Sequence, residues 1–305
     1  MASDVPAFTG PPGPLFDRLC LLGVGLIGSS IARVAKVRGD IARTVVAHAK
    51  TPATLQRVRE LGIADVVEAD PAKAVQGADC VIFCVPVGAY AEVMEAVAPH
   101  LAPGTIVSDV GSTKGSVVRD LLPLLPEGAQ LVPAHPMAGT EYSGPDAGFA
   151  ELFQGRYCIL TPLPGTDPRA VEKIAELWRR CGSMIETLDP ATHDKIVAVV
   201  SHLPHLIAFT ICSTADDLAE ETKEAVLKFA AAGFRDFTRI AASDPTMWRD
   251  VFLNNREALL EMLGRFTEDA HALGRAVRWG QADYIEDRIK RGRKIRRDLI
   301  ERKQA

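Results

Sequence analysis

One histidine, His135, stands near the middle of the chain, where residues 134–141 read Ala-His-Pro-Met-Ala-Gly-Thr-Glu. An apolar segment precedes it and a glycine-containing turn follows it. A histidine with an ordinary pKa of about 6.5 is largely neutral near pH 7 and can accept a proton from a reacting group. His135 is therefore a candidate general base, with a structural role as the alternative.

Ser112 is the second candidate, because it lies in a glycine-containing turn directly after an apolar strand predicted at 105–110. His135 follows another predicted strand, at 130–133. In an open α/β sheet, polar residues beyond the carboxyl ends of the strands line the ligand crevice. We therefore expect Ser112 and His135 to face one cleft.

A glycine-rich turn near the N-terminus indicates that the protein binds a dinucleotide. The apolar segment 18–22 is followed at once by Gly-Val-Gly-Leu-Ile-Gly, and the chain continues with helical spacing. Between a strand and a helix this pattern is typical of dinucleotide binding: the glycines permit a tight turn, close approach of a pyrophosphate, and close packing of the helix. The helix N-terminus adds free N–H groups. The expected cofactor-binding residues are Gly23, Gly25, Leu26, Ile27 and Gly28, together with Cys84, Val85 and Pro86 at the end of the strand predicted at 80–85.

The choice between NAD and NADP stays open in the sequence. The strand predicted at 44–48 ends where an acidic residue would hold the ribose 2′-hydroxyl, and here the chain reads Ala49-Lys50-Thr51. Lys50 and Thr51 either bind the extra phosphate of NADP or form a solvated turn while NAD is held elsewhere.

Strand and helix patterns alternate as far as about residue 188, and helical periodicity dominates beyond Asp189-Pro190. This predicts an α/β Rossmann-type dinucleotide-binding domain followed by an all-α C-terminal domain. We expect a disordered lead-in at 1–14, the nucleotide-binding domain at 15–188 and the helical domain at 189–305.

Two segments of the helical part carry polar residues in apolar surroundings. A helix predicted at 191–218 contains His202 and His205, and without a metal-binding pattern such as HExxH we interpret them as substrate contacts or satisfied core histidines. Residues 233–250 combine arginines with Phe and Trp, which suits one wall of a site for an anionic ring compound. A salt-bridged helix junction is the alternative for that segment.

The composition excludes several classes of protein. The 305 residues are 47% hydrophobic and 24% charged, which is typical of a soluble globular protein, and the formal net charge of −4 is too small to imply a nucleic-acid partner. No uninterrupted apolar run reaches the length of about 18 residues that a membrane span needs, and the N-terminus does not have the pattern of a signal peptide. The six cysteines are expected to be free thiols. We expect a cytoplasmic protein without a metal site.

The chain resembles the prephenate and arogenate dehydrogenase family of tyrosine biosynthesis. The resemblance rests on GVGLIG at 23–28, DVGSTKG at 109–115, HPMAGTEYSG at 135–144, SHLPH at 201–205 and GFRDFTRIAASDPTMWRD at 233–250. It implies a homodimer formed through the helical domain. It also implies that His135 accepts the proton of the substrate's 4-hydroxyl and that Ser112 orients His135 and the nicotinamide. His205, Arg239 and Trp248 would line the substrate site, with Arg239 paired to a carboxylate.

The resemblance further implies oxidative decarboxylation of prephenate, arogenate or both, with hydride transfer to NAD or NADP. The sequence does not decide between the substrates, nor whether tyrosine inhibits. Two alternatives stand beside this interpretation: another two-domain NAD(P)-dependent dehydrogenase, such as a β-hydroxyacid dehydrogenase, and a catalytically silent dinucleotide sensor. A β-hydroxyacid dehydrogenase relies on a lysine in its helical domain, and the matching region here has His205.

Overall fold

The computed structural model describes residues 13–218 and 220–302. They form two compact units, one that extends through Arg256 and one from Glu257 onward, and each is described by itself. The disordered lead-in predicted for residues 1–14 lies outside the described residues except for its last two.

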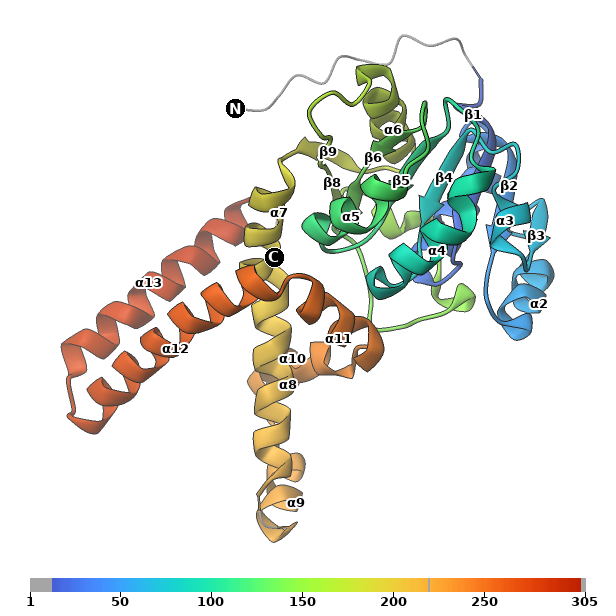
Figure 1. The fold of residues 1–305 in the computed structure, drawn as a ribbon. Coiled ribbons are helices and arrows are strands. Elements are labelled where there is room, and N and C mark those ends of the chain that lie inside the picture. The colour runs from blue at the N-terminus through green and yellow to red at the C-terminus, as the bar shows by residue number, and fades with distance from the viewer. Residues whose placement is uncertain (1–12, 219, 303–305) are drawn as a thin grey trace. The chain divides into compact units, whose positions relative to one another are not determined.

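The first unit is built on a six-stranded parallel sheet with the strand order β3-β2-β1-β4-β5-β6 (Figure 1). This is the doubly wound order of a dinucleotide-binding domain, so the predicted fold class is confirmed. Strand β4 is buried along its whole length, as expected for a strand covered on both faces. The strands are β1 (Phe16–Leu22), β2 (Ala42–His48), β3 (Val66–Glu68), β4 (Cys80–Phe83), β5 (Ile106–Asp109) and β6 (Gln130–Val132).

Helices cover both faces of this sheet and create two separate apolar cores. On one face α1, α2 and α6 contribute Ile31, Val58 and Trp178 to the core. On the other face α4 and α5 contribute Met94 and Leu121. The helices are α1 (Leu26–Arg38), α2 (Pro52–Leu61), α3 (Pro71–Ala74), α4 (Tyr90–Val97), α5 (Lys114–Leu121) and α6 (Pro168–Arg180). Single 3₁₀ turns lie at Val87–Ala89, Ala98–His100, Leu122–Leu124, Pro145–Ala147 and Ala150–Phe153.

A second, three-stranded sheet carries His135. It consists of β7 (Ala134–Pro136), β8 (Tyr157–Leu160) and β9 (Met184–Thr187), with β7 antiparallel and β9 parallel to β8. The sequence pattern placed His135 after the end of a strand. The structure places it inside β7, paired with Ile159, because the chain leaves the first sheet at Pro133 and starts a new strand at once.

After Asp189, whose side chain accepts a hydrogen bond from the Thr192 amide and caps α7, the first unit is helical. A π-helical turn at Ala198–His202 interrupts the single helix predicted at 191–218 and places His202 at a distortion of the kind often found at functional sites. The helices are α7 (Pro190–Val197), α8 (Leu203–Asp216), α9 (Glu220–Phe229), α10 (Ala232–Thr238) and α11 (Pro245–Asn254), with a 3₁₀ turn at Arg239–Ala242.

The run Pro190–Asp216 is long and apolar enough to cross a membrane by length and composition alone, and 22% of its most apolar stretch is buried. His202, Pro204 and His205 interrupt that stretch. A helix of a soluble protein that packs against another subunit satisfies the same criteria.

The second unit contains helix α13 (Ala282–Glu301) and all but the first residue of α12 (Arg256–Arg278), joined by a turn in which Gly280 has φ +62°. An ion pair between Arg288 and Asp269 links the two helices. Large apolar side chains remain exposed on both helices: Leu260, Phe266, Val277, Ile289, Ile295 and Ile300.

Candidate active site

The turn between β1 and α1 leaves space where a pyrophosphate would lie. Gly23 has φ +102°, and a Cβ on it would lie 2.8 Å from the backbone of Cys84 and Val85. A Cβ on Gly28 would lie 2.2 Å from the Gly23 carbonyl oxygen, whereas a Cβ on Gly25 would meet nothing within 4 Å. The first and third glycines are thus needed for packing and the second faces open space. This arrangement fits a dinucleotide held at the N-terminus of α1.

The end of β2 presents the two residues considered for the NADP phosphate. Lys50 is exposed. The Thr51 hydroxyl accepts a hydrogen bond from the Thr54 amide at 3.2 Å and bonds the Thr54 hydroxyl at 2.7 Å, so it caps helix α2. Thr51 therefore has a structural role that the sequence interpretation did not include.

His135 is fixed to the carboxyl edge of the large sheet through its neighbour Ala134. The Ala134 amide donates to Oδ1 of Asp109, the last residue of β5, at 3.1 Å. The ammonium group of Lys114 donates to the Ala134 carbonyl at 2.6 Å and forms a fully buried ion pair with Asp109 at 2.5 Å. Both partners of this ion pair bond the backbone of Ala134, so the pair holds the start of β7 in place.

A chain of hydrogen bonds runs from His135 into the helical segment. Nδ1 of His135 lies 2.8 Å from Nε2 of His193, and Nδ1 of His193 lies 2.8 Å from Oδ1 of Asp194. The carboxylate of Asp194 also accepts from the amides of Lys114 at 2.7 Å and Gly115 at 2.8 Å. Residues of β7, α7 and the start of α5 are thereby joined.

Burial keeps His135 neutral. Its side chain is largely enclosed, and burial lowers its pKa well below the ordinary value, with further lowering from His193, Lys114 and His202. The sequence interpretation assumed an unperturbed pKa. The shift does not remove the proposed chemistry, because a neutral imidazole is the form that accepts a proton.

Ser112 does not make the contact expected of it. Its side chain is half-buried and, among the residues the structure describes, forms no hydrogen bond. Nδ1 of His135 is bonded to His193. Whether Ser112 contacts a bound nicotinamide stays a prediction.

The predicted substrate residues lie together on α8, α11 and the turn between α10 and α11. The rings of His205 and Trp248 are stacked, with centroids 3.6 Å apart and planes at 21°. Nδ1 of His205 donates to the Ser201 carbonyl at 2.9 Å. Burial is the main cause that lowers the pKa of His205, and the charge of Arg239 lowers it further. Arg239 is 61% exposed and lies 3.5 Å from Glu141, so its guanidinium is accessible to a ligand.

His202 lies between the hydrogen-bonded chain that ends at Asp194 and the stacked rings of His205 and Trp248. Its ring is fully buried, lies edge-on to Trp248 with centroids 6.0 Å apart, and has Nδ1 3.0 Å from the side-chain nitrogen of Asn255. The other hydrogen of that amide group bonds the backbone oxygen of Asp194 at 2.8 Å. Nε2 of His202 is buried and has no hydrogen-bond partner within the described part of the chain.

Sequence reasoning missed His193, Asp194 and the burial of Lys114. Lys114 belongs to the DVGSTKG motif, but nothing in the motif indicates that its ammonium is buried. A His-Asp pair in the first turns of an otherwise apolar helix was the available signal for the other two.

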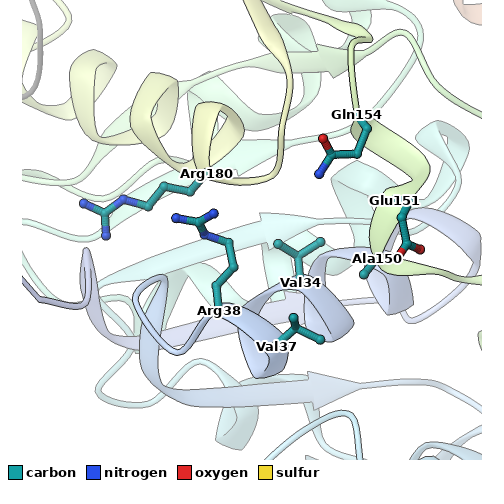
Figure 2. A pocket seen from close by; sticks show the side chains of 7 residues that line it. All are labelled: Val34, Val37, Arg38, Ala150, Glu151, Gln154 and Arg180. Carbon is teal, nitrogen blue, oxygen red and sulfur yellow. The ribbon is translucent and has the colours of Figure 1, made fainter.

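A shallow pocket of about 210 Å³ lies elsewhere, between the C-terminal ends of α1 and α6 and the turn at Ala150–Phe153 (Figure 2). Its two arginines already have acceptors in the protein: Arg38 bonds Asp40, and Arg180 bonds Glu176. None of the predicted site residues lines it.

Comparison with known proteins matches this geometry to one family. A family model described as the nucleotide-binding domain of prephenate dehydrogenase matches residues 31–187, and one described as its dimerization domain matches 189–291. The cyclohexadienyl dehydrogenase of Zymomonas mobilis is 40% identical over 283 residues, 92% of this chain and 96% of that protein. The prephenate dehydrogenase of Bacillus subtilis is 35% identical over 83% of this chain and 67% of that protein.

The crystal structure of prephenate dehydrogenase from A. aeolicus in complex with hydroxyphenyl propionate and NAD+ superimposes with a TM-score of 0.86 at 31% identity, covering 93% of this chain and 98% of that one. With the dinucleotide turn, the buried histidine and these matches in agreement, the chain belongs to the prephenate dehydrogenase family.

Proposed function

We propose that this protein catalyses the oxidative decarboxylation of prephenate, arogenate or both, with transfer of a hydride to NAD or NADP. The observation that carries the proposal is a buried, neutral His135 at the same sheet edge as an open dinucleotide turn. Membership of the prephenate dehydrogenase family excludes the β-hydroxyacid dehydrogenase alternative.

The nicotinamide, when bound, supplies the hydride acceptor. His135 would take the proton of the 4-hydroxyl as the hydride leaves C4 of the ring. The bond from C1 to the carboxylate then breaks, its electron pair enters the ring, and CO₂ departs as the ring becomes aromatic. Aromatisation provides most of the driving force, so the protein mainly needs to orient the substrate and hold a base.

Arg239 and the stacked pair of His205 and Trp248 suit the remaining parts of the substrate. Arg239 is exposed, and its only ionic contact within the described residues is with Glu141 at a loose 3.5 Å, so a substrate carboxylate can bind it at little cost. The aromatic stack offers a flat surface for the ring. These roles follow from the family resemblance and are supported by the proximity of the three residues.

A kinetic matrix tests the proposal. Prephenate and arogenate are each assayed with NAD and with NADP, and reduced cofactor is followed at 340 nm. We expect turnover with at least one substrate. A protein that binds the dinucleotide but turns over neither substrate is the silent sensor, and a strong preference for NAD over NADP would contradict phosphate binding at Lys50.

We also propose that the protein is a cytoplasmic homodimer formed through its helical part. The support is the match to a dimerization domain, the poorly buried apolar run Pro190–Asp216 and the exposed apolar side chains of α12 and α13. The six free cysteines suit a reducing compartment. Light scattering coupled to size exclusion should give twice the chain mass of 32.9 kDa, and a monomer would contradict this assembly.

A further inference from the structure

The hydrogen bonds to Asp194 fix the charge of its side chain. Its two oxygens accept from the amides of Lys114 and Gly115, and backbone N–H groups can only donate. Burial by itself would raise the pKa of Asp194, but the bonds from His193 and from the two amides outweigh it and hold the pKa below the ordinary value. Asp194 is therefore a carboxylate at neutral pH, and it can only accept a hydrogen bond from His193.

The direction of the first bond determines the direction of the next. Because Asp194 accepts, the proton of His193 lies on Nδ1. His193 is neutral, since burial lowers its pKa, so its Nε2 carries a lone pair. That nitrogen lies 2.8 Å from Nδ1 of His135, which must then donate. His135 is also neutral, and its lone pair is left on Nε2.

We propose that Asp194 and His193 are positioning residues that hold His135 as its Nδ1–H tautomer, so that Nε2 is the basic nitrogen presented to the substrate hydroxyl. The inference rests on the proposed role of His135 as the base. After proton transfer the same chain stabilises the imidazolium, because its Nδ1–H group faces the lone pair of His193 with the carboxylate of Asp194 behind it. The opposing charge of Lys114 is balanced by Asp109.

Asp194 also has a structural role, which the tests must separate from the proposed one. It caps the N-terminus of α5, whose own N-cap residue, Thr113, bonds the Ser116 hydroxyl and not a helix amide with its side chain. Substitution of Asp194 would therefore disturb α5 as well as His193. Substitution of His193 leaves both cap bonds in place, and so His193 is the residue to vary.

The first experiment reads the tautomers directly and needs no substrate. The protein is labelled with [¹⁵N]histidine, and two-bond ¹H–¹⁵N correlation spectra are recorded at pH 7.5, where its seven histidines are assigned by single substitutions. We expect His135 and His193 both to carry the proton on Nδ1. A proton on Nε2 of either residue in the unaltered protein would overturn the proposal.

The second experiment compares two variants of His193. His193→Phe removes the acceptor for His135, whereas His193→Gln keeps an amide oxygen that can accept the same hydrogen bond. We expect His193→Phe to lower kcat by about 10²-fold, the size of a lost general-base contribution, and to populate the Nε2–H tautomer of His135. KM for both substrates should change by less than about threefold, and His193→Gln should recover most of kcat.

A purely structural role predicts a different pattern: lower melting temperature and weaker dinucleotide binding in both variants, with the tautomer of His135 unchanged. That pattern, or an unchanged kcat in His193→Phe, would overturn the proposal. Failure of the proposed function is distinguishable, because it would appear as no turnover in the unaltered protein while the tautomer spectrum still reports on the hydrogen-bonded chain.

Discussion

At the scale of single residues, the site depends on a histidine whose protonation state is set by what surrounds it. His135 is enclosed, bonded through Nδ1 to His193, and near the buried ammonium of Lys114. Burial and the charge of Lys114 both disfavour the protonated form in the resting enzyme. The neutral form is therefore the resting form near pH 7.

The His135→Asn variant should lose at least about 10² in kcat, because the proton acceptor is removed while a side chain of similar polarity remains. Dinucleotide affinity, measured by fluorescence titration, should be unchanged, since the glycine turn is untouched. Near-normal turnover would exclude His135 as the base.

The pH dependence of kcat/KM follows from the lowered pKa of His135. Activity requires the neutral form, so it should be constant near pH 7 and fall only at pH values below the ordinary histidine value of about 6.5. An acid limb centred at or above pH 6.5 in the initial-rate profile would show that burial does not depress the pKa in the free enzyme.

Arg239→Ala should raise KM strongly with a smaller loss of kcat, as expected when an interaction with a substrate carboxylate is lost in the ground state and in the transition state alike. Arg249→Ala is the matched control, because Arg249 is similarly exposed and bonds only its neighbour Asp250 within the described chain. Unchanged KM in Arg239→Ala would remove the carboxylate-binding role.

At the scale of elements, the β1–α1 turn assigns different tasks to its glycines. A Cβ on Gly28 would collide with the Gly23 backbone, so this position is required for packing of α1 on β1. Gly25 has open space around it, so it is required only when the dinucleotide is present. Substitutions within this one hexapeptide can therefore separate an effect on the stability of the fold from an effect on dinucleotide binding.

Gly25→Ala should leave the melting temperature unchanged and weaken dinucleotide binding, since the added methyl group occupies the space of the pyrophosphate. Gly28→Ala should lower both, and so it is the control for structural damage. Calorimetric titration and thermal unfolding of the two variants measure this. Equal affinity of Gly25→Ala and the unaltered protein would contradict the proposed position of the cofactor.

At the scale of the whole molecule, the buried His202 makes the free energy of unfolding depend on pH. Burial lowers the pKa of His202 to about 4, despite a partly compensating effect of Asp194, and the neighbouring His193 and His205 lower it further. The folded protein therefore binds the proton less readily than the unfolded chain does. Stability contributed by neutral His202 is complete above about pH 6.5 and is lost as the pH falls towards 4.

The unaltered protein should lose about 3 kcal/mol more unfolding free energy between pH 7 and pH 4 than His202→Asn, which cannot be protonated. Urea unfolding at fixed protein concentration measures the difference. His100→Asn, which replaces an exposed histidine, serves as the control for the removal of one imidazole. Parallel pH dependence in His202→Asn and the unaltered protein would contradict the assignment.

The sequence by itself determined the features that depend only on residues close together in the chain. The glycine turn, the order of strands and helices and the presence of His135 beyond the sheet edge can all be predicted, because turn geometry and periodicity are local properties. The same locality explains the error at β7, since the start of a new strand after Pro133 depends on pairing with β8, more than 20 residues later.

Only the tertiary structure decided how His135 is held and how basic it is. His193 lies 58 positions from His135, and Asp194 lies 80 positions from the amide of Lys114 that it accepts from. Such contacts arise when the helical segment packs on the sheet, and the same packing excludes the water that sets an ordinary pKa. The candidate base could therefore be proposed from the chain, but its tautomer, its hydrogen-bond partners and its pKa shift could not.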